Sequence, residues 1–209
     1  MDVFVSVGVA ATPAHEEFIA AIESRLKAAE LAPKTVGRNA FSSDAPLKHV
    51  IDLMNECHGA VVIALERSSF PMGVEKRAGK ETPLENVKLP TIWNQTEAVM
   101  AYTRGLPLLV IAQKGLKSEG LLESKYDWNV QWVEPTEASL ATPAFLGIFE
   151  SWKKKVVAYR PPARSAEPRT VKDLWDLFLG LAPSHAWSIA GAFVVIVSGA
   201  FALGAKLFP

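Results

Sequence analysis

The sequence predicts an α/β fold: a doubly wound parallel sheet of about five strands, followed by a C-terminal transmembrane helix. Three observations lead to this prediction. Short apolar runs alternate along the chain with segments of helical periodicity, which is the order of a parallel sheet covered by helices. The run at 59–65 (GAVVIAL) is continuously apolar, as strands buried on both faces are. The run at 186–205 carries no charge and has the length of a membrane span.

Five apolar runs are predicted to be strands. The chain opens on DVFVSVG, and the second candidate, LAPKTVG, is the most polar of the set. The central runs are rich in β-branched residues, which favour strands. In chain order the predicted strands are 2–8, 31–37, 59–65, 106–112 and 130–133.

Four segments with apolar residues three and four apart are predicted to be helices. They cover 16–29, 46–57, 93–104 and 143–159. In a doubly wound sheet, ligands bind beyond the carboxyl ends of the strands, near the point where the strand order reverses. We therefore expect a site built from residues 6–8, 37–47, 65–69 and the start of the 93–104 helix.

The end of the chain is predicted to hold the protein in a membrane. Residues 185–206 form the predicted transmembrane helix, preceded by a Pro- and Arg-rich linker at 160–170 and by a juxtamembrane amphipathic helix at 171–184. Basic residues precede the span and only Lys206 follows it. The positive-inside rule therefore predicts a single-pass protein of a bacterial inner membrane, with the domain at 1–159 in the cytoplasm and in contact with membrane lipid.

Composition excludes several classes of function. The 209 residues carry a formal net charge of zero, which argues against direct nucleic-acid binding through phosphate charge. The single cysteine, Cys57, fits a reducing compartment. The histidines show no metal-ligand spacing, so no metal site is predicted.

Three motifs resemble the Toll/interleukin receptor (TIR) domain family. DVFVSVG is similar to its first-strand box, and the segment from Gly37 to Phe70 is similar to its second strand, BB loop, second helix and third strand. The most specific match is Trp93-x-x-x-Glu97, a W-x-x-x-E motif that enzymatic TIR domains carry. The resemblance implies a flavodoxin-like sheet and cleavage of the nicotinamide–ribose bond of NAD by Glu97. Nucleoside deoxyribosyltransferases have a similar sheet and a comparable glutamate, and 94–112 resembles either family.

Two stretches depart from the TIR pattern. Residues 68–89 form a longer connection before Trp93 than the family usually has, and long connections in compact domains are often functional or disordered. Residues 115–132 are also not typical of the family.

The predicted catalytic residue is Glu97. Asn94 and Trp93 lie three and four residues before it, so all three share a helix face. A carboxylate there can stabilise the oxocarbenium-like state of N-glycosidic cleavage, and nicotinamide leaves as a neutral pyridine without a general acid. From the residues alone, one alternative remains open: Glu97 is a solvated helix residue and Trp93 is a core aromatic. The predicted ligand-binding residues are Ser6, Gly8, Arg38, Phe41, Ser42, Trp93 and Asn94.

Three functions follow as expectations. The first is a membrane-anchored TIR-like effector of prokaryotic antiviral defence that hydrolyses NAD or a related nucleotide, which serves as substrate and not as a cofactor. The second is a sensor without catalysis, in which a nucleotide signal drives homo-oligomerisation and the spans disrupt the membrane; small residues such as Ala200 and Gly204 would let spans approach. The third is a nucleoside deoxyribosyltransferase-like hydrolase. A partner defence protein is a further expectation.

Overall fold

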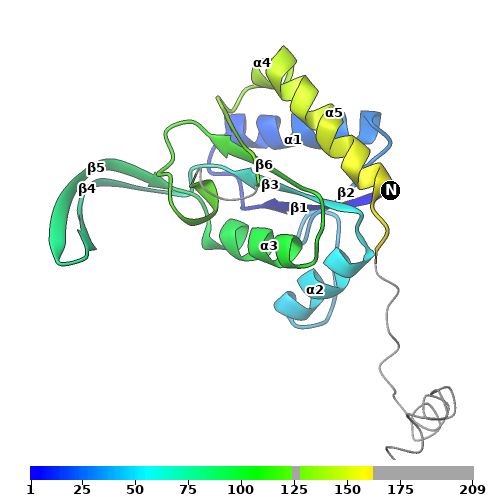
Figure 1. Ribbon diagram of the computed structural model, residues 1–209, viewed down its shortest axis with the longest axis horizontal. Coiled ribbons are helices and arrows are strands. Elements are labelled where there is room, and N and C mark those ends of the chain that lie inside the picture. Colours follow the sequence, from blue (N-terminus) through cyan, green and yellow to red (C-terminus); the bar gives the residue numbers. More distant parts are fainter. Residues whose placement is uncertain (124–127, 162–209) are drawn as a thin grey trace, which may run out of the picture. The chain divides into compact units, whose positions relative to one another are not determined.

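A computed structural model describes residues 1–123 and 128–161, and it contains the predicted five-stranded parallel sheet (Figure 1). The strands lie in the order β2-β1-β3-β6-β7, and every neighbouring pair is parallel. The prediction of an α/β fold with five parallel strands is confirmed. Their bounds are β1 (Asp2–Val7), β2 (Ala32–Lys34), β3 (Gly59–Ala64), β6 (Leu108–Gln113) and β7 (Val130–Val133).

Helices cover both faces of the sheet, as the doubly wound prediction requires. Figure 1 shows α1 and α5 over one face, with α2 and α3 on the other. The hydrophobic clusters agree, because α1 and α5 share one cluster while α2 and α3 contribute to another. The helices are α1 (Pro13–Ala28), α2 (Pro46–Glu56), α3 (Ile92–Thr103), a short α4 (Glu137–Leu140) and α5 (Pro143–Ala158).

Threonine caps fix where three of these helices begin. The side chains of Thr12, Thr91 and Thr142 each accept a hydrogen bond from a backbone N–H of the first turn that follows. Such a bond satisfies a donor that has no partner within the helix. Proline follows Thr12 and Thr142 directly, a position where its missing N–H costs nothing. The Thr12 cap explains why α1 begins three residues earlier than its periodicity predicts.

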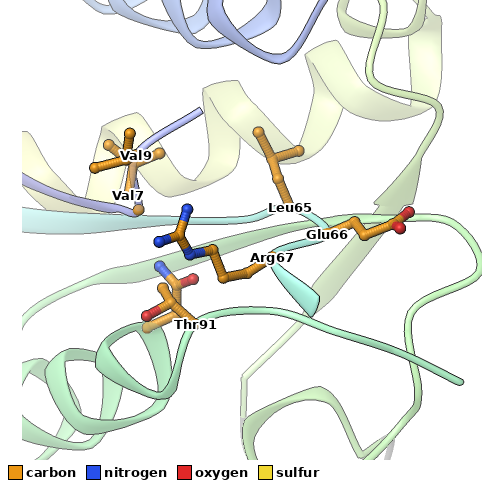
Figure 2. A pocket seen from close by; sticks show the side chains of 8 residues that line it. Val7, Val9, Leu65, Glu66, Arg67 and Thr91 are labelled. Carbon is orange, nitrogen blue, oxygen red and sulfur yellow. The ribbon is translucent and has the colours of Figure 1, made fainter. Parts of the chain in front are cut away.

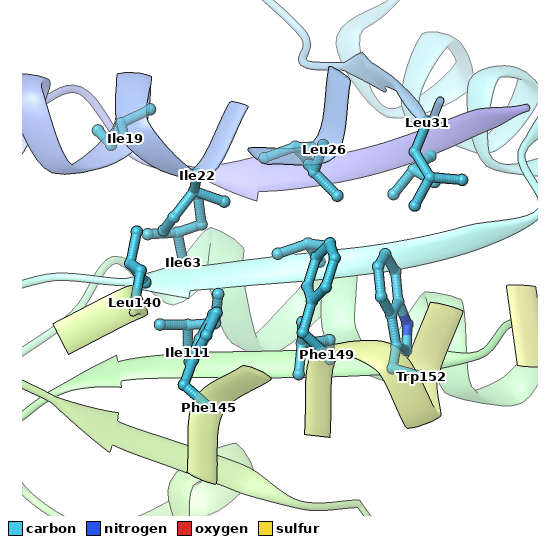
Figure 3. Close-up of a cluster of buried hydrophobic side chains, with 14 of the residues drawn as sticks. Ile19, Ile22, Leu26, Leu31, Ile63, Ile111, Leu140, Phe145, Phe149 and Trp152 are labelled. Carbon is cyan, nitrogen blue, oxygen red and sulfur yellow. The ribbon is translucent and has the colours of Figure 1, made fainter. Parts of the chain in front are cut away.

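The largest core lies between the sheet and the α1/α5 layer (Figure 3). Phe145, Phe149 and Trp152 descend from α5 onto the central strands, and all three are almost fully buried. The Trp152 indole also donates a hydrogen bond to the Pro107 carbonyl at 2.9 Å. At Gly59, on the first residue of β3, a Cβ would lie 2.6 Å from a methyl of Val156, so only glycine lets α5 approach the sheet this closely.

The long connection at 68–89, for which no strands were predicted, is a β-hairpin. Strands β4 (Ser68–Arg77) and β5 (Lys80–Leu89) pair antiparallel over their full length and extend away from the main sheet (Figure 1). Ala78 and Gly79 both have positive φ, as the central residues of a type I′ turn do. Alternate positions in β4 are apolar (Phe70, Met72 and Val74), which is strand periodicity.

The second predicted strand, 31–37, is shorter than expected because side-chain bonds end it. Asn39 Oδ1 accepts a hydrogen bond from the Thr35 backbone N–H at 2.7 Å, and Asn39 Nδ2 donates to the Pro33 carbonyl at 3.0 Å. These bonds turn the chain after Lys34. A 3₁₀ turn at Gly120–Leu122 and the short α4 were not predicted.

The membrane predictions fall almost wholly outside the described part of the chain. Within residues 1–123 and 128–161, no helix has both the length and the apolar character needed to cross a bilayer. The predicted juxtamembrane helix at 171–184 and transmembrane helix at 185–206 lie outside the described residues, as does the linker at 160–170 from residue 162 onward.

Candidate functional site

The strand order reverses between β1 and β3. From β1 the chain continues to β2 on one side, whereas β3 lies on the other side of β1. Two neighbouring strands whose connections depart in opposite directions leave a crevice beyond their carboxyl ends. Here this crevice is a small pocket (Figure 2). Parts of the expected ranges 6–8 and 65–69 and the start of α3 line this pocket, whereas 37–47 does not.

Three segments form the pocket walls. One follows β1, a second follows β3, and the third is the start of α3. The enclosed space, with its open mouth included, is about 240 Å³. The lining residues are Val7, Gly8, Val9, Leu65, Glu66, Arg67, Thr91 and Asn94.

A buried hydrogen-bonded trio lies next to the pocket and joins β1 to α3. Asn94 Nδ2 donates to the Ser6 hydroxyl oxygen at 3.0 Å and to the Ser6 carbonyl at 3.3 Å. With its oxygen accepting from Asn94, the Ser6 hydroxyl has its own proton free to donate to the Glu97 carboxylate, with which it forms a hydrogen bond. The geometry thus brings Ser6 and Asn94, two predicted ligand-binding residues, together with Glu97, the predicted catalytic residue.

Glu97 is a carboxylate in a poorly solvated position. Burial raises the pKa of the Glu97 carboxyl above its ordinary value of 4.5, and the hydrogen bond with Ser6 lowers it in part. Desolvation disfavours the ionised form, and a hydrogen bond to that form favours it. A carboxylate held in this way attracts positive charge more strongly than one in bulk water, because little solvent screens it.

The raised pKa of Glu97 predicts that Glu97→Gln stabilises the folded protein at neutral pH. Well below pH 4.5 the carboxyl is protonated in both the folded and the unfolded chain, so charge makes no difference between wild type and variant. As the pH rises from 4.5 through the folded pKa, the unfolded chain releases its proton first and the wild type loses stability relative to the variant. Thermal melting at pH 4 and pH 7 measures this.

The melting temperature of Glu97→Gln should exceed that of the wild type by more at pH 7 than at pH 4. Glu85, which is exposed on β5, provides a matched control. Glu85→Gln should show no pH-dependent difference. Equal pH dependence of the wild type and Glu97→Gln would contradict the burial of this charge.

Trp93 lies on the surface at the start of α3. Its side chain is 53% exposed, so the alternative of a core aromatic does not hold. The neighbouring Ile92 is also exposed, as is Val9 on the opposite wall of the pocket. An exposed indole one helical turn before Glu97 is available for stacking against a planar ring.

The residues predicted between the second strand and the second helix do not line this pocket. The Arg38 guanidinium binds two carboxylates of α1, with 2.6 Å to Glu16 and 3.3 Å to Glu23. Phe41 is 76% exposed, and Ser42 accepts a hydrogen bond from the Asp44 backbone N–H. Their role in ligand binding stays a prediction.

Arg67 and Thr91 belong to the pocket but were not singled out from the sequence. Both flank the hairpin, Arg67 just before β4 and Thr91 just before α3. The Arg67 backbone N–H donates to the Leu89 carbonyl at 2.8 Å, which brings the two walls together. Arg67 could have been found from its position directly after a buried strand at the point where the strand order reverses. Its closeness to Thr91 could not, because the hairpin that brings the two residues together was not predicted.

In the part of the chain that the structure describes, no three His, Cys, Asp or Glu side chains gather in a way that could hold a metal ion. Comparison with protein-family models and with curated proteins finds no match to this chain. The resemblance to TIR domains therefore rests on the motifs quoted above.

Proposed function

We propose that the protein hydrolyses the N-glycosidic bond of NAD or a related nucleotide, with Glu97 as the catalytic carboxylate. The observation that carries this proposal is the trio of Ser6, Asn94 and Glu97 beside a pocket at the strand-order reversal. The W-x-x-x-E motif points to the same glutamate from its resemblance to enzymatic TIR domains.

The proposed reaction needs one anionic group. The bond between the ribose C1′ and the pyridinium nitrogen breaks, and its electron pair passes to that nitrogen, so nicotinamide leaves neutral. Positive charge develops on the ribose, where the Glu97 carboxylate stabilises it. Water then adds to C1′ and releases a proton. Trp93, exposed at the same helix start, would stack on the nicotinamide ring.

The proposed setting is a membrane-anchored effector of prokaryotic antiviral defence. The uncharged run at 186–205 and the basic residues before it support the anchor, and the TIR resemblance supports the role in defence. NAD depletion in the cytoplasm would then arrest the infected cell, with activation by a partner defence protein or by homo-oligomerisation.

Release of nicotinamide tests the proposed function. The full-length chain is incubated with NAD, with and without a library of nucleotides as activators, and nicotinamide is quantified over time. We expect turnover under at least one activating condition. If no condition gives nicotinamide release, hydrolysis is not the function.

A second candidate is a nucleotide sensor whose membrane helices act as the effector. One observation favours it: Asn94 lines the pocket, whereas Glu97 does not, so a ligand can occupy the pocket without meeting the carboxylate. Membrane potential and NAD recorded together after activation separate the two functions. The enzyme predicts that NAD falls first, and the sensor predicts depolarisation with NAD unchanged.

A further inference from the structure

We propose that the pocket binds a phosphate group of the ligand, with Arg67 as its main cation. The ligand class is then a phosphorylated nucleotide rather than a nucleoside. This inference deepens the proposed function and rests on it for the identity of the site. The binding of a phosphate at Arg67 can nonetheless be tested without any turnover.

The Arg67 guanidinium is a cation that no other side chain of the described residues neutralises. Figure 2 shows its guanidinium reaching back from the end of β3 toward Val7 and Thr91, which belong to the other two walls. Within the described residues, no ion pair or side-chain hydrogen bond of this guanidinium is found. Arg38 differs, because two carboxylates already neutralise it. A planar guanidinium with its donors free is well suited to phosphate.

The acidic neighbour in the pocket does not oppose an anion. Glu66 also lines the pocket, but its carboxylate points away from Arg67 in Figure 2. It forms an ion pair with Lys88 at 2.8 Å. Of the two charged residues that line the pocket, Glu66 is therefore paired with a lysine, and Arg67 is left to meet an anion.

Helix α3 presents its N-terminus to the same pocket. Thr91, its capping residue, lines the pocket, and the first turn of this twelve-residue helix contains no acidic side chain. The partial positive charge of the helix end is therefore available to an anion. Gly8 lies close to this helix start. A Cβ at Gly8 would lie 3.2 Å from the Thr91 methyl group, a tight contact.

Asn94 supplies an independent indication of a ligand. Its side chain is 1% exposed and lines the pocket, yet its Oδ1 atom has no hydrogen-bond partner. A buried acceptor without a partner costs free energy, so such atoms are rare unless a ligand or water satisfies them. A sugar hydroxyl of the ligand would supply the donor that Oδ1 lacks. Phosphate on Arg67 and a hydroxyl on Asn94 together describe the phosphate–ribose part of a nucleotide.

Paired probes that differ only by a phosphate test this inference. Binding to the full-length chain is measured by calorimetry for nicotinamide mononucleotide against nicotinamide riboside, and for AMP against adenosine. A Glu97→Gln background prevents turnover. We expect the phosphorylated member of at least one pair to bind at least about tenfold more tightly, the size of a charge-assisted hydrogen bond.

Arg67→Ala should abolish this preference, and Arg67→Lys should retain part of it. Arg77→Ala is the matched control, since Arg77 is exposed at the tip of the hairpin, and it should leave the preference unchanged. Equal binding within both pairs would overturn the inference, as would a preference that survives Arg67→Ala or a failure of all four probes to bind. If the phosphate preference holds while no nicotinamide is ever released from NAD, the phosphate site stands and N-glycosidic hydrolysis fails.

Discussion

Replacing Glu97 by glutamine is expected to lower nicotinamide release from NAD by at least about 100-fold while leaving the fold intact. Glutamine has the shape of glutamate, and its carbonyl oxygen can still accept the hydrogen bond from Ser6. What it lacks is the negative charge that opposes the developing ribosyl cation. The loss should therefore appear in kcat, with a smaller change in KM, because the charge acts mainly in the transition state.

Two variants make this result specific. Glu85→Gln removes an exposed carboxylate from β5 and should leave turnover unchanged. Ser6→Ala removes the hydroxyl that orients Glu97 without removing the charge, and should lower turnover less than Glu97→Gln does. If Glu97→Gln keeps wild-type turnover, Glu97 is not the catalytic carboxylate, even where the enzyme is active.

Replacing Trp152 by alanine is expected to reduce the free energy of unfolding by about 3–5 kcal/mol. The indole is 4% exposed and packs against Phe149, with ring centroids 5.6 Å apart. It also donates a hydrogen bond to Pro107. Its removal leaves a cavity between α5 and the sheet, which the closely approached backbone at Gly59 cannot fill. Urea unfolding of the full-length chain, followed by far-ultraviolet circular dichroism, measures the change.

Trp152→Phe separates packing from hydrogen bonding. The Pro107 carbonyl also accepts a bond from the Ala60 backbone N–H at 2.9 Å, so it keeps a partner when the indole is lost. The phenylalanine variant should therefore recover most of the stability. Phe41→Ala, at an aromatic residue that is 76% exposed, should change stability by less than about 0.5 kcal/mol. A small effect of Trp152→Ala would mean that α5 does not close the core.

The central sheet could be predicted because its strands are buried on both faces. Continuous apolar runs such as 59–65 have few alternative structures, and helical periodicity between them fixes the layers. Glu97 and Asn94 could be placed together because three residues on a helix span less than one turn. Their bonds to Ser6 follow from the packing of α3 against β1, which the fold shows and the spacing of residues along the chain does not.

The hairpin could not be predicted with the same rule, because neither of its strands is buried. Charges and prolines break up its alternation, and the Ala78–Gly79 turn lacks the Asn-Gly or Asp-Gly pair that usually marks such turns. The ion pairs of Arg38 could not be predicted from the sequence either. Its partners Glu16 and Glu23 lie far from it in the sequence, and only the packing of α1 beside the β2 turn brings them together.

The hairpin has a consequence for how the chain can be extended. Its base joins the two walls of the pocket, since Ser68 pairs with Leu89 and Arg67 bonds to the same residue. The loop that separates Arg67 from Thr91 is thus closed near the pocket, and its outer end at Ala78–Gly79 contributes nothing to that closure. Closure entropy grows only slowly with loop length, so added residues at this outer end cost little. The tip is therefore the place where a peptide tag or a fluorescent reporter domain can be inserted while the spacing of the pocket walls is preserved.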